Sequence, residues 1–188
     1  MGKLIYGMLT SLDGYIAATD GSLVLPVPEA QLHWYFNAQM TRASLVLHGR
    51  RMYQVMRAWD TEGDKPGASE VVVDFARAWK LTPKLVFSTT LQEVGPNARL
   101  VKGEVEKVVK GVKADVDGEI MVAGAGLAAS LARLGLIDEY QLFVQPVVLG
   151  GGRPFFEAGL GLRLKLAETK SLPQGVVALR YINDTAPG

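Results

Sequence analysis

The stretch GEIMVAGAGLAASLARLGLIDEYQLFVQPVVLGGGRPFF, which runs from Gly118 to Phe156, decides the fold of this chain. Residues 120–123 predict a short buried strand. Gly124 and Gly126 follow it and let the backbone turn tightly and approach a ligand closely. The next residues predict a helix whose free N–H groups would face an anion. Residues 140–149 then predict a long strand, so a phosphate-binding type of turn is followed by more β-structure.

The turn at residues 124–129 matches the dinucleotide fingerprint G-x-G-x-x-A, but its surroundings do not match a Rossmann fold. That fold needs an acidic residue at the end of the next strand, about 20 residues further on, to bind the ribose. Here the next strand ends in VVLG at residues 147–150, without an acid, and residues 164–171 and 176–183 predict a closing hairpin. We therefore retain the pyrophosphate-binding role, with a purely structural turn as the alternative, and reject the Rossmann fold.

Strand and helix patterns alternate along the rest of the chain. Apolar runs predict strands at residues 3–9, 44–48, 84–88 and 98–101, and apolar residues at helical spacing predict helices at residues 29–42, 50–59, 69–79 and 105–112. The total is about eight strands and five helices, with parallel β–α units before an antiparallel end. The sequence thus predicts an α/β protein with a mixed, mostly parallel sheet, and we expect one domain of residues 1–188.

The composition is that of an ordinary globular protein and excludes several classes of function. The chain has 188 residues, of which 48% are hydrophobic, and no cysteine, which excludes disulfides and thiolate metal sites. A net charge of +1 gives no general field for nucleic acid or an anionic membrane, so phosphate binding must be local. No apolar run is long enough for a membrane helix, and the N-terminal segment lacks the features of a secretory signal. We therefore expect a cytoplasmic protein without nucleic-acid or membrane partners.

A second candidate for phosphate binding is the turn His48-Gly49-Arg50-Arg51. Two arginines at the start of a helix oppose its dipole, an arrangement that makes sense if an external phosphate lies between them and the helix N–H groups. Ser88 and Thr89 end the next strand and offer hydroxyl donors at the same edge of a parallel sheet. Together these residues can bind the 2′-phosphate of NADPH, although a solvated basic turn with a threonine helix cap fits the sequence equally.

A third candidate is the segment Thr10-Ser11-Leu12-Asp13-Gly14-Tyr15. A strand that ends in hydroxyl groups and one carboxylate, followed by glycine, can line the mouth of a pocket. The alternative is a plain turn that caps itself through Asp13. If the segment does line a pocket, Asp13 is the first candidate for a polar contact at the reacting centre.

These segments, in this order, resemble the C-terminal reductase domain of the bacterial riboflavin-biosynthesis deaminase-reductase and, more broadly, the dihydrofolate reductase-like superfamily. The resemblance covers nearly the whole chain. It rests on SLDGYIA at residues 11–17, LVLHGRRMY at 45–53, KLVFSTTL at 84–91 and the long block at 120–156. It implies a three-layer α/β fold with a mostly parallel eight-stranded sheet and an antiparallel C-terminal strand. It also implies that NADPH binds along the strand ends.

The resemblance assigns roles to individual residues at three cofactor positions and around the substrate. The cofactor residues are Gly49, Arg50 and Arg51 at the 2′-phosphate, Ser88 and Thr89 beside the adenine ribose, and Gly124, Ala125, Gly126 and Leu127 at the pyrophosphate. Ser11, Asp13 and Gly14 fall where the family places the nicotinamide and substrate. Arg153 would lie at the mouth of the substrate pocket, with a structural turn as the alternative.

Two substitutions and one absence limit what the resemblance implies. Gln31 occupies the position of the acid that supports pterin protonation in dihydrofolate reductases, so dihydrofolate is a poor substrate and Gln31 becomes a substrate-binding candidate. Met52 replaces a phosphate-binding threonine. Without cysteine, the chain cannot form the zinc site of the deaminase half and can only be a freestanding reductase. A substrate with a ribose phosphate would need a second anion site, for which Lys65, Arg153 and Arg57 are the candidates.

The function predicted from the sequence is that of an NADPH-dependent oxidoreductase. It would reduce a small heterocyclic or carbonyl/imine substrate, in resemblance to the 5-amino-6-(5-phosphoribosylamino)uracil reductase of riboflavin biosynthesis. The alternative is a nucleotide-binding relative that has lost catalysis. We expect a homodimer on the basis of the family. We expect no metal site, because His33 and His48 lack carboxylates at ligand spacing and are more typical of surface or turn histidines.

Overall fold

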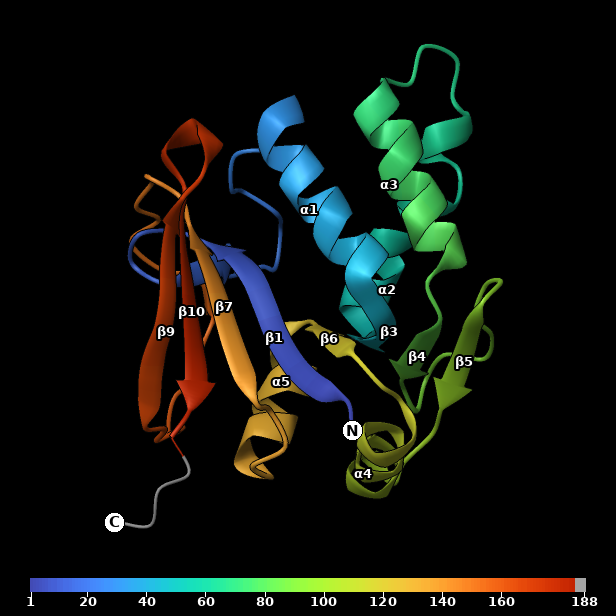
Figure 1. The fold of residues 1–188 in the computed structure, drawn as a ribbon, viewed down its shortest axis with the longest axis vertical. Helices are drawn as coiled ribbons and strands as arrows, with labels where there is room; N and C mark the ends of the chain where they lie inside the picture. The colour runs from blue at the N-terminus through green and yellow to red at the C-terminus, as the bar shows by residue number, and fades with distance from the viewer. Residues whose placement is uncertain (185–188) are drawn as a thin grey trace.

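A computed structural model describes residues 1–184 and has a central eight-stranded sheet (Figure 1). The strands lie in the order β5-β4-β3-β6-β1-β7-β10-β9. Their bounds are β1 (Lys3–Thr10), β3 (Ala43–Gly49), β4 (Lys84–Phe87), β5 (Ala98–Val101), β6 (Glu119–Ala123), β7 (Glu139–Val144), β9 (Leu164–Ser171) and β10 (Val177–Asn183). A separate two-stranded sheet pairs β2 (Tyr15–Ala17) with β8 (Arg153–Pro154).

The sheet is parallel except at β10. β1 pairs in parallel with β6 and β7, and β3 pairs in parallel with β6 and β4. β10 runs antiparallel to both β7 and β9, which forms the closing hairpin. The predicted mixed sheet with an antiparallel C-terminal strand is therefore confirmed.

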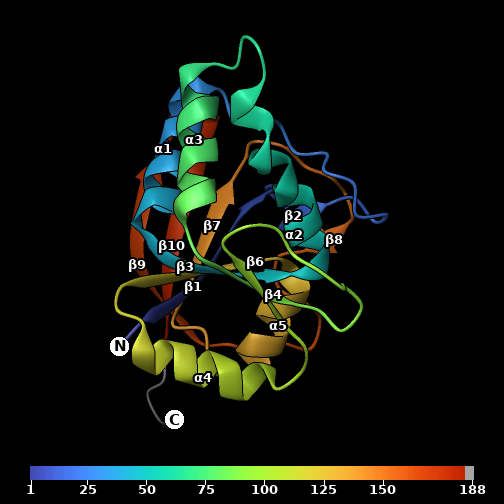
Figure 2. The same ribbon diagram turned by 90° about the vertical axis from the view of Figure 1, so that its right-hand side faces the viewer.

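Helices cover both faces of the sheet, which gives the three layers of the predicted fold (Figures 1 and 2). The helices are α1 (Ala30–Arg42), α2 (Arg50–Met56), α3 (Glu70–Leu81), α4 (Val105–Asp115) and α5 (Ala125–Arg133). α1 and α3 lie on one face, and α4 and α5 lie on the other. α2 belongs with α1 and α3, because Tyr53 and Met56 pack with Phe75 and Trp79.

The two faces of the sheet carry different kinds of core. Under α4 and α5 the apolar side chains form one continuous cluster that includes Tyr6, Leu47 and Val122. Under α1, α2 and α3 the core is divided into two clusters. One is built around Leu32 and Phe143, and the other around Tyr53, Phe75, Trp79 and Val86. The space between these two clusters is where the candidate site lies.

The strand predicted at residues 140–149 is shorter in the structure. β7 ends at Val144, and the amide of Gln145 still donates to the carbonyl of Thr10 at 2.8 Å. Pro146 has no N–H and cannot continue the ladder in the middle of a sheet. The chain then bends, since the amide of Val147 donates to the carbonyl of Gln145 at 2.8 Å. The residues after Pro146 are therefore free to form a loop at the edge of the sheet.

The helix predicted at residues 50–59 also ends early, whereas α5 ends in a well-formed glycine cap. α2 ends at Met56 and two short 3-10 turns follow, at Arg57–Asp60 and Glu62–Asp64. At the end of α5, Gly135 has φ of +66°. Its amide donates to the carbonyl of Ala132 at 2.9 Å, and the next amide donates to Leu131 at 3.0 Å. This is a Schellman cap, which needs a left-handed residue at that position.

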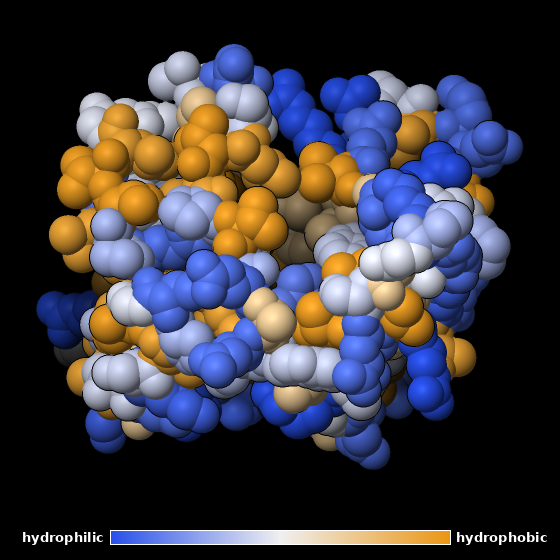
Figure 3. Space-filling model, turned by 90° about the horizontal axis from the view of Figure 1, so that it is seen from above, coloured by the Kyte–Doolittle hydropathy of each residue, from blue (hydrophilic) through white to orange (hydrophobic). Residues whose placement is uncertain are grey.

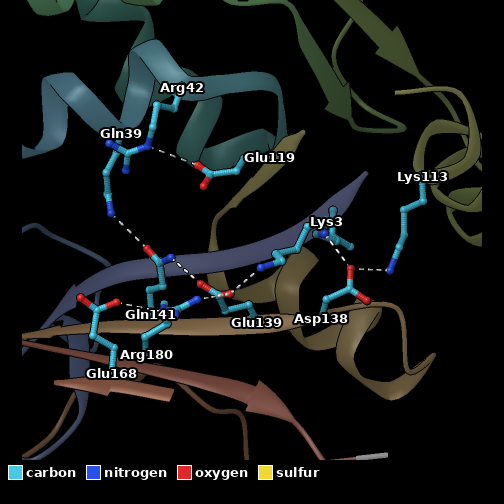
Figure 4. A network of polar contacts seen from close by, with 11 residues as sticks. Lys3, Gln39, Arg42, Lys113, Glu119, Asp138, Glu139, Gln141, Glu168 and Arg180 are labelled. Atoms are coloured by element: carbon cyan, nitrogen blue, oxygen red, sulfur yellow. Dashed lines mark hydrogen bonds and ion pairs between the residues drawn. The ribbon is translucent and has the colours of Figure 1, made fainter. Parts of the chain in front are cut away.

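A buried carboxylate joins three strands at the opposite edge of the sheet from the candidate site (Figure 4). Glu139 at the start of β7 is fully buried. It accepts hydrogen bonds from Lys3 of β1 at 3.2 Å, from Arg180 of β10 at 3.1 Å and from Gln141 at 2.7 Å. Glu168 of β9 binds the other side of the Arg180 guanidinium at 3.1 Å. The charge of Glu139 is therefore matched, and the network connects the parallel strands to the closing hairpin.

Replacing Glu139 tests this connection. Glu139→Gln keeps the volume but loses two charge-assisted hydrogen bonds, so we expect the free energy of unfolding in urea to fall by about 1.5–3 kcal/mol. Glu168→Gln removes a half-exposed partner of the same arginine and should cost less than about 1 kcal/mol. Equal losses for the two variants would contradict the structural role of the buried carboxylate.

Candidate active site

Four polar or glycine-containing turns meet at the carboxyl edge of the parallel strands. β4, β3, β6 and β1 are neighbours in the sheet and run in the same direction. The segments that follow them are residues 88–90, 49–52, 124–127 and 11–14. The carboxyl edge of an open α/β sheet is the usual position for ligands. The structure therefore brings the sequence-predicted cofactor segments to one edge.

The turn before α5 has the geometry of an anion cradle. Gly124 has φ of +108°, and a Cβ on it would lie 3.2 Å from the Cβ of Met52, so a side chain there would be strained and crowded. The first hydrogen bond of the helix runs from the amide of Ala128 to the carbonyl of Gly124 at 3.1 Å. The preceding amides, those of residues 125–127, have no acceptor within the helix. They can bind an anion such as a pyrophosphate.

The arginine turn lies directly against this cradle. A Cβ on Gly49 would lie 3.6 Å from the Cβ of Leu127, so the first turns of α2 and α5 are in contact. Arg50 and Arg51 are exposed, and neither forms a salt bridge with any residue in the described part of the chain. A groove of about 440 Å³ runs beside them. It is lined by Arg50, Phe87, Ser88, Thr89, Thr90, Val101, Gly103 and Val105. Arg50 and the hydroxyl turn therefore face the same groove, as the sequence predicts.

Arg153 lies beside the first turn of α5 and not at the mouth of the cavity, where it was predicted. Its guanidinium Nη2 is 3.1 Å from the point that a Cβ on Gly126 would occupy, so it covers the first turn of α5. The same nitrogen is 4.0 Å from a carboxylate oxygen of Glu157. Arg153 is not among the residues that line the main cavity. Arg153 begins β8, which pairs with β2.

A cavity of about 450 Å³ opens beside the turns, between the two core clusters of the α1 face. Figure 3 shows the hollow from above, with hydrophobic side chains gathered beside it. The lining residues are Gly7, Met8, Leu9, Ile16, Leu23, Leu25, Pro26, Val27, Pro28, Phe36, Gln39, Met40, Val46, His48, Met52, Val55, Met56, Phe75, Met121, Val122, Ala123 and Phe143. Among these, only Gln39 and His48 have polar side chains.

The sequence creates this cavity by placing small residues at inward positions of two central strands. Side chains alternate between the faces of a strand. Tyr6 packs in the core under α5, whereas the small residues Gly7 and Ala123 line the cavity on the other face. Five of the six methionines of the chain line the cavity. Methionine is flexible and polarisable, so such a lining can adapt to the shape of a ligand.

His48 is the polar side chain of the cavity wall that has no partner. It is 1% exposed, and neither ring nitrogen has a hydrogen-bond partner in the described residues. Its ring packs against Tyr53 and Trp79, with centroids 5.9 and 5.4 Å away. Burial, and to a smaller degree the nearby Lys84 ammonium, lower the pKa of His48 to about 3. The imidazole is therefore neutral at physiological pH, and the expectation of a surface or turn histidine was wrong.

Asp13 holds a loop in place and does not line the cavity. Its carboxylate accepts the amides of Leu149 at 3.1 Å and Gly150 at 2.7 Å. The hydrogen bond with Ser11, followed by these backbone amides, lowers the pKa of Asp13. Gly14 has φ of +84°, and its amide donates to the carbonyl of Ser11 at 3.0 Å. These contacts make Asp13 the anchor of the loop at residues 149–150, which differs both from a turn capped through Asp13 itself and from the expected contact with the reacting centre.

Gln31 also lies away from the cavity. It is exposed on α1 and is not among the lining residues. The face of α1 that borders the cavity carries Phe36, Gln39 and Met40. Gln31 is five residues before Phe36, about 140° away around the helix. The helix was predicted correctly, but its rotation about its own axis depends on packing that the sequence does not state.

The sheet order, the layers and the closing hairpin define a dihydrofolate reductase-like α/β protein. A model of the RibD C-terminal domain matches residues 2–178, and the chain belongs to this family. A curated relative is the uncharacterised protein YyaP of Bacillus subtilis, which is 26% identical over 184 residues, with 95% of this chain and 94% of that protein covered. The resemblance seen in the sequence motifs is therefore confirmed.

Solved structures support the same fold. A putative riboflavin biosynthesis protein from Shewanella has 26% identity and a TM-score of 0.74, with 97% of this chain and 99% of that chain covered. The deaminase/5-amino-6-(5-phosphoribosylamino)uracil reductase of Thermotoga maritima has 15% identity and a TM-score of 0.66. The match covers 97% of this chain and 56% of the Thermotoga chain. Dihydrofolate reductase from Enterococcus faecalis, complexed with NADP(H), has 13% identity and a TM-score of 0.65, with coverages of 97% and 96%. None of the helices within residues 1–184 is long and apolar enough to span a membrane.

The buried neutral histidine predicts a specific dependence of stability on pH. Because the pKa of His48 is about 3 when folded and 6.5 when unfolded, the unfolded state binds more protons between these values. This histidine therefore lowers the free energy of unfolding by up to about 1.4 kcal/mol per pH unit as pH falls below 6.5. His48→Phe should show a shallower loss than wild type in urea titrations between pH 7 and about pH 4. Parallel curves for the two proteins would contradict the burial of a neutral imidazole.

Proposed function

We propose that this protein is an NADPH-dependent reductase that transfers a hydride to a small heterocyclic, carbonyl or imine substrate. The observation that carries the proposal is the meeting of an anion cradle, an arginine turn and an apolar cavity at one edge of the sheet. Such turns suit the phosphates of a dinucleotide, and the cavity suits the flat rings that react. The similarity to a putative riboflavin biosynthesis protein of Shewanella and to the uracil reductase of Thermotoga favours a reductase related to riboflavin biosynthesis.

The residues present fit a bound NADPH. Residues 124–127 would hold the pyrophosphate through backbone amides, at a turn whose positive φ favours glycine at position 124. Arg153 would add a cation to the same subsite, since its guanidinium covers Gly126. Arg50 and the hydroxyl turn would hold the 2′-phosphate and adenine ribose across their shared groove, with Arg51 beside them.

Within the cavity, side chains of this protein would position the reacting rings and keep water away from them. When bound, the nicotinamide ring supplies the hydride. The methionine and aliphatic side chains would exclude water and hold the substrate ring over the cofactor. Asp13 would act indirectly, by holding the loop at Leu149 and Gly150 in place. Among the described residues that line the cavity there is no carboxylate.

That missing carboxylate also favours a second candidate function, a nucleotide-binding protein without reductase activity. Gln31 and Asp13, the two residues considered for acid or polar roles, both lie outside the cavity wall. Binding of NADPH without its oxidation in the presence of carbonyl and imine compounds would favour this candidate. The homodimer and the cytoplasmic location expected from the sequence stay predictions.

Replacing the arginine turn tests the cofactor assignment. In Arg50→Ala/Arg51→Ala, we expect the dissociation constant for NADPH to rise by roughly 10–100-fold, because a hydrogen bond to a charged group contributes about 1.5–3 kcal/mol. The constant for NADH should change far less, since NADH has no 2′-phosphate. Titration calorimetry with both cofactors measures the two constants.

Arg163→Ala serves as the matched control. Arg163 precedes β9, at the opposite edge of the sheet, and its loss should change neither constant. Equal weakening of NADPH and NADH in the double variant would refute a 2′-phosphate role for the two arginines. Failure of the wild-type protein to bind either cofactor would refute the proposed function.

A further inference from the structure

The cavity wall carries no formal charge. None of the residues that line it is lysine, arginine, aspartate or glutamate. Its one histidine is neutral, because burial lowers the pKa of His48 to about 3. The side-chain amide of Gln39 donates to Gln141 at 3.1 Å, outside the lining residues. An anionic group that entered this space would lose its hydration without gaining a counter-charge.

The three cations considered for binding a substrate phosphate contact other groups. Lys65 binds the carboxylate of Glu62 at 2.7 Å, and Arg57 lies 3.9 Å from that of Asp60. Arg153 covers the first turn of α5, where the cofactor pyrophosphate is proposed to bind. None of these three cations lines the cavity. The second anion site that a ribose-phosphate substrate requires is therefore missing from the cavity wall.

The mouth of the cavity is apolar as well. Leu23 is 63% exposed and Val27 is 80% exposed, and both line the cavity. Leu12 and Val148 are exposed on two adjoining loops at the same edge, which are joined by the hydrogen bond from the amide of Leu12 to the carbonyl of Val147 at 2.7 Å. Hydrophobic side chains gather along one side of the hollow in Figure 3. An apolar ligand would gain by covering them.

One polar contact is available inside. Both ring nitrogens of His48 lack partners and have almost no accessible surface, which is costly, and a ligand group can satisfy one of them only when the ring turns towards the cavity that His48 lines. A neutral imidazole has one donor and one acceptor nitrogen, so it can bind either a carbonyl oxygen or an N–H group.

From these observations we infer that the substrate is an uncharged, flat and largely apolar ring compound, with one polar edge that hydrogen-bonds to His48, and not a phosphorylated or carboxylated metabolite. The inference rests on the proposed function, since it concerns the substrate cavity beside the cofactor. It separates this protein from a reductase that acts on a phosphoribosylamino-pyrimidine. His48 is on this view a substrate-binding residue that sets the orientation of the ring.

Equilibrium binding of matched probes tests the inference without requiring turnover. The probes are quinoxaline, which is flat and uncharged, quinoxaline-2-carboxylate, which adds one negative charge, and uridine 5′-monophosphate. We expect quinoxaline to bind at least about tenfold more tightly than its carboxylate, and the nucleotide not to bind, with and without NADP⁺ present. Tighter binding of either anion, equal binding of the quinoxalines, or no binding of quinoxaline overturns the inference.

Two variants test the role of His48. His48→Phe should weaken quinoxaline binding about three- to tenfold, while the melting temperature is unchanged or higher, because the unpaired nitrogens are gone. His33→Phe replaces the other histidine, which is bonded to Asn37 and lies outside the cavity lining, and should leave quinoxaline binding unchanged. Unchanged binding in His48→Phe overturns the assigned contact.

Titration with NADPH in the same samples keeps the two proposals apart. If NADPH binds and the anionic probes bind more tightly than quinoxaline, the proposed function stands and the inferred substrate class is wrong. If quinoxaline binds with the expected preference but NADPH does not, the cavity chemistry stands and the reductase assignment fails.

Discussion

The carboxyl ends of four neighbouring parallel strands, β4, β3, β6 and β1, meet at one edge of the sheet, and the candidate site is attached to that edge. The turns that follow these strands are far apart in the sequence. The turns after β3 and β6 nevertheless touch, because ladder hydrogen bonds fix the strand positions: Gly49 approaches Leu127, and Gly124 approaches Met52. Parallel pairing thus assembles the cofactor segments. The buried Glu139, paired with Lys3 and Arg180, connects the parallel strands β7 and β1 to the hairpin of β9 and β10.

The site occupies a place where the core is incomplete. On the α5 face the strands bury a continuous apolar cluster, whereas on the α1 face Gly7 and Ala123 leave a cavity between two clusters. Side chains that line a cavity have fewer packing contacts than those in a filled core, and the unpaired His48 adds a desolvation cost. Stability given up at one position of an otherwise well-packed sheet is typical of a functional site. A ligand that fills the cavity and pairs with the imidazole would recover both losses.

Local motifs predicted much of the fold and the positions of the cofactor turns, but not the direction of single side chains. The positive φ of Gly124 follows from its place between a buried strand and a helix. The rotation of α1, which directs Gln39 and not Gln31 to the cavity, depends on tertiary packing. So do the contact of Arg153 with α5 and the use of Asp13 as a loop anchor. The sequence did contain one indication that His48 is buried. It lies two residues after the apolar Val46, so the two side chains share one face of β3.

Hydrogen exchange measured by mass spectrometry, with and without saturating NADPH, tests the central claim most directly. The amides of residues 125–127 lack acceptors in the helix and would gain them from the pyrophosphate. We predict slower exchange at residues 124–127, 49–52 and 88–90 when NADPH is bound. Exchange around Glu139, at the amino ends of the parallel strands, should not change. Binding of NADPH without protection of these three turns, or no effect of NADPH on exchange anywhere, would contradict this prediction.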